Sequence, residues 1–147
     1  MKIFNDFKEK LINKILNGKK FTLDECATFR YWFAHYCVVN ALAIKFGVWK
    51  PKYLLHDIEK PFLKLIWVDA DKVQEFHVKH ARHHPQNKPF ERIYLEEMLL
   101  DWESARYSKE FAPLSAREFY EQKYKDKTKF TEEQQKRIEE TLEKLGL

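Results

Sequence analysis

Histidines and aspartates are the residues of this sequence whose types and order could do chemistry. Four of the six histidines fall between residues 77 and 84, a fifth stands in the dipeptide His56-Asp57, and the last is His35. Asp101 lies further along the chain, among apolar residues. Imidazole and carboxylate groups together suit a divalent transition ion such as iron, manganese, cobalt or zinc. The sequence therefore predicts a site for one or two divalent metal ions.

Helical spacing indicates which histidines of the 77–84 cluster point the same way. At about 100° per residue, His77, His80 and His84 fall within an arc of roughly 60°, whereas His83 points away from His84. Because Pro85 follows, the backbone of His84 could leave the helix, and either member of the pair could turn inward. We favour His80 and His84 as ligands, with His83 as the alternative, and expect His77 to lie outside the ligand set.

We expect helices to position these side chains, because the sequence carries residues that typically start and end helices. A helical pattern over residues 4–16 is followed by Gly18, a natural stop. Thr22 and Glu25 form a capping box, in which a hydroxyl and a carboxylate satisfy free amides at a helix start. We expect one helix over about 22–46, carrying the first histidine.

Prolines divide the next part of the chain. Pro51 suits the first turn of a short helix that carries the His-Asp dipeptide. Pro61 should end that helix, because proline removes a helical hydrogen bond. A short buried helix is expected over 62–68, and Asp69 or Asp71 should cap a helix that runs to the end of the histidine cluster.

The rest of the chain carries further helix signals. Pro89 opens a helix to about Tyr107, and Gly146 closes the last helix. Two capping boxes lie between them, Ser115 with Glu118 and Thr131 with Gln134. The apolar positions of the first of these helices are Ile93, Leu95, Met98, Leu99 and Trp102. The helices over about 115–146 could complete the core, cover the site or form a dimer contact.

Composition narrows the fold class. The 147 residues are 44% hydrophobic and 16% aromatic, which excludes a disordered chain. Only 3 Gly and 5 Pro argue against a β sandwich or barrel, which needs many hairpin turns. We expect a single all-α domain over residues 1–147, with six to eight helices and a motif-bearing core at about 28–108.

The net charge and the lengths of the apolar segments limit the possible binding partners and the cellular location. The net charge is +4, and the lysine excess near the start could attract nucleic acid, although a solvated helix face is the favoured interpretation. The start is too charged for a signal peptide, and the longest uncharged run, residues 31–44, is too short to span a membrane. On one helix Cys26 and Cys37 would lie about 16 Å apart, too far for a disulfide. We therefore expect a cytoplasmic protein without membrane contact.

The ordered set of chemical residues resembles the HD-domain superfamily, whose members are all-α and mostly metal-dependent phosphohydrolases. The segment 56–60, His-Asp-Ile-Glu-Lys, is similar to the HD-x-x-K form of the superfamily motif. The segment 80–85, His-Ala-Arg-His-His-Pro, resembles the extra histidines of the branch that holds two metals. The segment 97–102 looks like the one that bears the final aspartate in a group of small bacterial and phage HD-like proteins. The resemblance covers about residues 28–108.

Carried over residue by residue, the resemblance implies two sets of metal ligands. The implied ligands of the first ion are His35, His56, Asp57 and Asp101. Asp57 would bridge to a second ion, which would be held by His80 together with His84 or His83. Two ions about 3.5 to 4 Å apart would lower the pKa of a bridging water and make hydroxide available at neutral pH.

The resemblance also implies an activity. Asp57 and Lys60 would be catalytic, and Lys60, Arg82 and Lys88 would bind substrate. Lys60 lies four residues after His56, so on a helix its ammonium would share that face and reach a phosphate oxygen or the leaving group. The implied function is that of a phosphomonoesterase or phosphodiesterase acting on a small phosphorylated substrate, which the resemblance implies to be of the nucleotide type.

Two other functions stay open at this point. The same ligand set could hold two irons that activate oxygen, since iron serves both as a Lewis acid and as a redox centre. The chain could also be a non-catalytic binding or inhibitory module that keeps the fold. A homodimer is compatible with either function.

Overall fold

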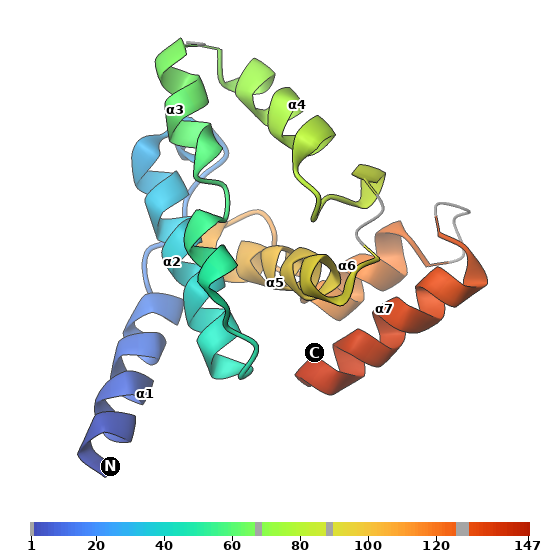
Figure 1. Ribbon diagram of the computed structural model, residues 1–147. Helices are drawn as coiled ribbons and strands as arrows, with labels where there is room; N and C mark the ends of the chain where they lie inside the picture. Colours follow the sequence, from blue (N-terminus) through green and yellow to red (C-terminus); the bar gives the residue numbers. More distant parts are fainter. Residues whose placement is uncertain (1, 67–68, 88–89, 126–129) are drawn as a thin grey trace.

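The computed structural model describes residues 2–66, 69–87, 90–125 and 130–147 (Figure 1). Its α-helices are α1 (Lys2–Leu16), α2 (Phe29–Lys45), α3 (Glu59–Ile66), α4 (Ala70–His80), α5 (Arg92–Ser108), α6 (Ala116–Lys123) and α7 (Glu132–Leu145). Three 3₁₀ turns lie between them: η1 (Asp24–Ala27), η2 (Pro51–Leu55) and η3 (Pro85–Asn87). Within the described residues there is no strand, so the expected all-α fold with six to eight helices is confirmed.

Helix α5 lies at the centre, between α2 on one side and α6 and α7 on the other (Figure 1). One apolar cluster joins α1, α2 and η2, and Leu100 of α5 belongs to it. A second cluster joins α5 to α6 and α7, and it contains four of the apolar positions expected from the sequence: Leu95, Met98, Leu99 and Trp102. The C-terminal helices therefore complete the core around α5, which is one of the three roles left open for them.

The chain enters α2 through a break that the sequence analysis missed. Glu25 does accept a hydrogen bond from the Thr22 amide (3.0 Å), but this bond opens only the single turn η1. Thr28 then takes an extended conformation (φ −94°, ψ 153°), and its hydroxyl accepts from the Tyr31 amide to cap α2. The prediction of one helix over 22–46 is therefore wrong, because a second cap residue restarts the helix six residues later.

The segment around the prolines also differs from the expectation. Pro51 does begin a helical turn, but η2 ends at Leu55. The His-Asp dipeptide thus lies in a turn and not on a helix. Pro61 does not end a helix, since it lies in the first turn of α3, where a missing amide proton leaves no helical bond unmade. The expected helix at 62–68 is present over its described part, as the end of α3, but Phe62 and Leu65 are 62% and 83% exposed, so the expectation that it is buried is wrong.

Helix α4 begins as expected and ends early. The side chain of Asp69 accepts from the Asp71 amide (2.9 Å) and caps the helix. The helix ends at His80, and Ala81 is extended (φ −72°, ψ 123°). The last two histidines of the cluster therefore lie in a loop, and the helical arc predicted for them does not apply.

The C-terminal helices follow their local signals. Both predicted capping boxes are present, one opening α6 and the other opening α7. Gly146 ends α7 with a left-handed backbone (φ 71°). Pro89, the predicted start of the preceding helix, lies outside the described residues, and α5 is described from Arg92. Among the described helices, none combines the length and the apolar character needed to cross a membrane.

Candidate metal centre

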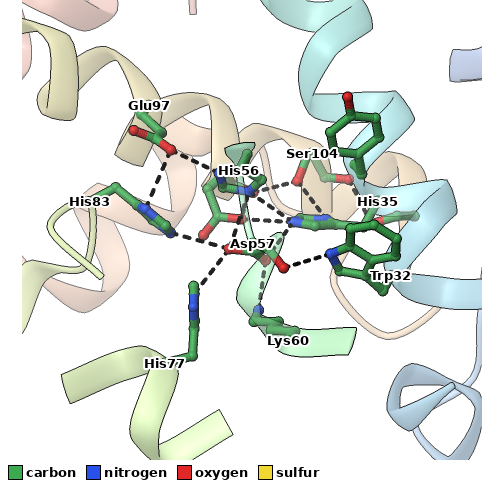
Figure 2. Close-up of polar contacts among 12 residues, drawn as sticks. Trp32, His35, His56, Asp57, Lys60, His77, His83, Glu97 and Ser104 are labelled. Carbon is green, nitrogen blue, oxygen red and sulfur yellow. Dashed lines mark hydrogen bonds and ion pairs between the residues drawn. The ribbon is translucent and has the colours of Figure 1, made fainter. Parts of the chain in front are cut away.

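The turn between η2 and α3 places Asp57 in the middle of the molecule. Its backbone is left-handed (φ 56°), a conformation that costs most residues about 1–2 kcal/mol but that aspartate tolerates better. Two bonds hold the turn: Trp32 Nε1 donates to the Asp57 carbonyl oxygen (2.8 Å), and the Lys60 amide donates to the same oxygen (3.1 Å). The buried Asp57 carboxylate therefore projects among side chains from α2, α4 and α5 (Figure 2).

One group of potential ligands joins α2, the turn and α5. It consists of His35, His56 and Asp101, whose ligand atoms all lie within 4.8 Å of one another. Asp101 Oδ1 is 3.0 Å from His35 Nε2 and 3.7 Å from His56 Nε2. The two imidazole Nε2 atoms are 3.4 Å apart. We call this group the first half-site.

A second group joins α4 to the loop that follows it. It consists of His77, His83 and His84, whose ligand atoms also lie within 4.8 Å of one another. All three Nε2 atoms are buried and make no hydrogen bond within the described residues. Buried polar atoms normally have a hydrogen-bond partner, so three buried nitrogen atoms without one in a single cluster indicate a place for a ligand. We call this group the second half-site.

The Asp57 carboxylate lies between the two half-sites. Its Oδ2 atom is 3.7 Å from His35 Nε2 in the first half-site. Its Oδ1 atom is 3.1 Å from His77 Nε2 and 3.7 Å from His83 Nε2 in the second. The expected arrangement, in which Asp57 serves both groups, is compatible with these distances. The clusters could hold metal ions.

Outer hydrogen bonds fix which nitrogen of three rings faces the half-sites. His56 Nδ1 donates to Glu97 Oε1 (3.0 Å), and His77 Nδ1 donates to Glu59 Oε1, since a carboxylate only accepts. Ser104 donates its one proton to a backbone carbonyl of α5 (2.7 Å), so its oxygen accepts from His35 Nδ1 (3.1 Å). In the neutral rings the Nε2 lone pairs therefore point at one another and at carboxylate oxygens.

This arrangement needs a cation. The Nε2 atom of neutral His35 and the Asp101 carboxylate are both acceptors, yet they are 3.0 Å apart. Acceptors held this close repel one another unless a proton or a metal ion lies between them. An ion with nitrogen and oxygen ligands would satisfy both, and the outer bonds are those that orient histidine ligands in metal sites. The residues present therefore fit a divalent metal.

The pKa shifts of the buried histidines also fit a metal site. Burial lowers the pKa of His83 to about 3 and that of His84 to about 4, so both rings are in the neutral form that binds metals. Burial alone would also lower the pKa of His56, but the neighbouring carboxylates, Asp57 foremost, raise it to about 10. Without a metal, His56 therefore keeps a second proton beside the carboxylates. A bound metal ion would replace the positive charge of that proton.

The structure reverses the expectation for two histidines. His80, a favoured ligand, is exposed: its Nδ1 donates to the Phe76 carbonyl (2.8 Å) and its ring stacks on Phe76 (centroids 4.1 Å apart). It belongs to neither half-site. His77, expected outside the ligand set, is buried in the second half-site. Within α4 it is thus His77 whose Nε2 lies beside Asp57 (3.1 Å), and the early end of α4 lets the following loop bring both His83 and His84 into the same cluster.

The other predicted site residues lie at different distances from the centre. Lys60 does not share a helix with His56, because α3 begins only at Glu59, but its Nζ is 2.7 Å from Asp57 Oδ2, which places its charge at the site. Arg82 lies further out, where it donates to the Tyr94 hydroxyl (3.2 Å). Both Arg82 and Tyr94 line a cleft of about 380 Å³ that is also lined by Asp57, His77 and His83. Lys88 lies outside the described residues.

Three residues whose side chains contact the Nδ1 atoms of these histidines were missed by the sequence analysis: Glu59, Glu97 and Ser104. A signal for two of them was available, because Glu97 and Ser104 stand four residues before and three after Asp101 on α5. That spacing puts all three on one face of a helix. Glu59 lies two residues after Asp57, inside the segment that carries the superfamily resemblance.

Comparison with family models, curated proteins and solved structures finds no match to this chain.

Proposed function

We propose that the chain is a metal-dependent phosphohydrolase that acts on a small phosphorylated substrate at the two half-sites. The observation that carries the proposal is the pair of ligand groups on either side of Asp57, with imidazole nitrogens facing carboxylates. The residues of the first half-site, together with Asp57, are the set that the HD-domain resemblance implies for a first ion. The type of reaction follows from that resemblance.

Each half-site would hold one divalent ion, either iron, manganese, cobalt or zinc. The first ion would bind to His35, His56 and Asp101, and the second to His77, His83 and His84, with Asp57 shared. Bound ions of this kind supply Lewis acidity, which makes water more acidic and neutralises phosphate oxygens. The protein supplies the fixed ligand directions and a largely buried setting.

Lys60 is suited to hold the phosphate. Its ammonium has three N–H donors, and the contact with Asp57 Oδ2 (2.7 Å) engages one of them. The side chain is 23% exposed, so the remaining donors can reach a group that approaches from solvent. Lys60 would thus orient a phosphate oxygen or stabilise the charge of the leaving group, while its charge keeps Asp57 ionised.

The cleft supports a small substrate. Its volume of about 380 Å³ is in the range of pockets that take a single small molecule. Arg82 lines it and could pair with a negatively charged part of the substrate. The proposal that the substrate is of the nucleotide type comes from the superfamily resemblance.

The test combines metal analysis with a phosphatase panel. We expect untagged protein to contain at least half a metal ion per chain and to release phosphate or cleave a phosphodiester in one class of nucleotide substrates, with added manganese, iron or cobalt. His56→Ala removes a proposed ligand of the first half-site, so it should lower the metal content and abolish the turnover. His80→Ala is the matched control, since this exposed histidine lies outside both half-sites and should leave the metal content unchanged.

Other outcomes would identify the alternative functions. Protein without metal would contradict the proposal at its first step. Protein that binds metal yet turns over no phosphorylated compound would favour a binding or inhibitory module. Oxygen consumption by the reduced, iron-loaded protein with a candidate substrate would favour the oxidative chemistry of a diiron enzyme.

A further inference from the structure

One carboxylate of α5 lies behind both half-sites. Glu97 Oε1 is 3.0 Å from His56 Nδ1 in the first half-site and 3.5 Å from His83 Nδ1 in the second (Figure 2). Its other oxygen forms an ion pair with Lys52. The Glu97 side chain is only 7% exposed, so its position is fixed by these partners.

The two rings need this support for different reasons. His56 follows the last residue of η2, so no helical turn holds its ring. His83 lies in the loop after α4, and its Nε2 is buried without a hydrogen-bond partner in the described part of the chain. An imidazole turns freely about its last bond unless its second nitrogen is held. Glu97 is the acceptor within reach of the Nδ1 atoms of both rings.

We propose that Glu97 is a positioning residue that presents Nε2 of His56 and of His83 to the two ions and so joins the two half-sites. This inference rests on the proposed function, because it concerns the same metal centre. The inference goes beyond the proposed function because it makes metal affinity at both half-sites depend on Glu97, a residue outside both proposed ligand sets.

The structure supplies matched comparisons for this role. Ser104 holds a ring of the first half-site only, through His35 Nδ1. Glu59 holds a ring of the second half-site only, through His77 Nδ1. Glu97 alone among these three faces rings of both half-sites. Loss of each acceptor should therefore give a different pattern of weakened binding.

The experiment is a cobalt(II) titration of the metal-free protein, followed by calorimetry and by the visible absorption of bound cobalt. We expect the wild type to bind two ions. Glu97→Met should weaken both binding steps by about 10–100-fold and change the absorption of both bound ions. Ser104→Ala should weaken one step and Glu59→Gln the other. Glu97→Gln keeps an oxygen acceptor and should restore most of the affinity lost in Glu97→Met.

Two controls separate positioning from a general structural effect. Lys52→Met removes the ion pair of Glu97 but keeps the acceptor for both rings, so it should leave both cobalt spectra close to those of the wild type. Thermal unfolding in a chelator shows whether each variant is folded before metal is added. A folded Glu97→Met variant that binds two ions as the wild type does, or loses affinity at one step only, would overturn the inference.

Failure of the proposed function gives a different result. If the wild type binds no cobalt, the metal centre itself is refuted. If the wild type binds two ions and the Glu97→Met variant binds them equally well, the centre stands and only the role of Glu97 is refuted.

Discussion

Two buried carboxylate sites meet at α5, and they are neutralised in different ways. Glu96 is fully buried, and three cations of the chain surround it: Lys50 Nζ at 3.1 Å, Arg92 Nε at 3.0 Å and Lys144 Nζ at 2.9 Å. These cations join α5 to α7 and to the residue before η2. The chain itself therefore supplies more than enough positive charge for Glu96.

The candidate metal centre, which Glu97 contacts from the next position on α5, has fewer cationic side chains. Asp57 and Asp101 lie among histidine Nε2 atoms, and the lysine bonded to this pair of acids is Lys60, at Asp57 Oδ2. The contrast shows that burial of acids alone does not indicate a metal site. The informative feature is a set of buried acids faced by imidazole nitrogens, since such a set takes up a cation, either a proton on an imidazole or a metal ion in its place.

The largest effect is expected from Asp57→Asn. Asparagine tolerates the left-handed backbone of this turn, but it removes the negative charge that faces both half-sites. We expect metal affinity to fall by at least about 100-fold, which corresponds to about 2.7 kcal/mol. Elemental analysis after dialysis measures this loss. Glu96→Gln is the counterpart at the other acid, and equal metal loss in the two variants would remove the distinction between the sites.

A smaller effect separates two histidines of α4. His77→Ala removes a buried ligand of the second half-site, and we expect at least a tenfold loss of affinity for one ion. His80→Ala removes an exposed ring that is bonded to the Phe76 carbonyl, and we expect less than a twofold change. Calorimetric titration with manganese or cobalt compares the two. The reverse ranking would contradict the assignment of His77, and not His80, to the second half-site.

The Glu96 site should matter for stability and not for metal. Glu96→Gln leaves three cations without a charged partner, but their side chains are 40% to 70% exposed and can turn into water. We therefore expect a loss of about 1–2 kcal/mol in the free energy of unfolding, below the 3–5 kcal/mol typical of breaking a fully buried pair. Chemical denaturation in a chelator measures the loss without a contribution from metal. An unchanged unfolding midpoint would show that the three contacts contribute nothing.

The smallest expected effect is that the loss of unfolding free energy in Glu96→Gln depends on pH. Burial opposes ionisation of Glu96, but Lys144, Arg92 and Lys50 lower its pKa below the ordinary 4.5. A lowered carboxyl pKa stabilises the fold above the unfolded value and loses this contribution as the pH falls through the folded value. The stability difference between wild type and Glu96→Gln should therefore be full at pH 6 and shrink below about pH 4.5. Denaturation at several pH values checks this, and a difference that grows in acid would contradict it.

Much of the fold could be predicted because helix ends are encoded within a few residues. The capping boxes at Ser115 and Thr131 and the left-handed Gly146 were all read from local sequence and are present. The prediction from local sequence was wrong at Thr22, because the helix that begins there is only the single turn η1. Thr28 is a second residue of cap type, and its hydroxyl caps the long helix that packs against α5.

The sequence by itself also determined the chemical set: a lone histidine, a His-Asp pair, a histidine cluster and a late aspartate. The tertiary structure brings His35, His56, Asp57 and Asp101 together as their order suggested. It alone decided that His77 replaces His80 and that Glu97 stands behind two rings. The physical reason is range: caps and helical periodicity act over a few residues, whereas the end of α4 and the meeting of its loop with α5 depend on contacts between distant segments.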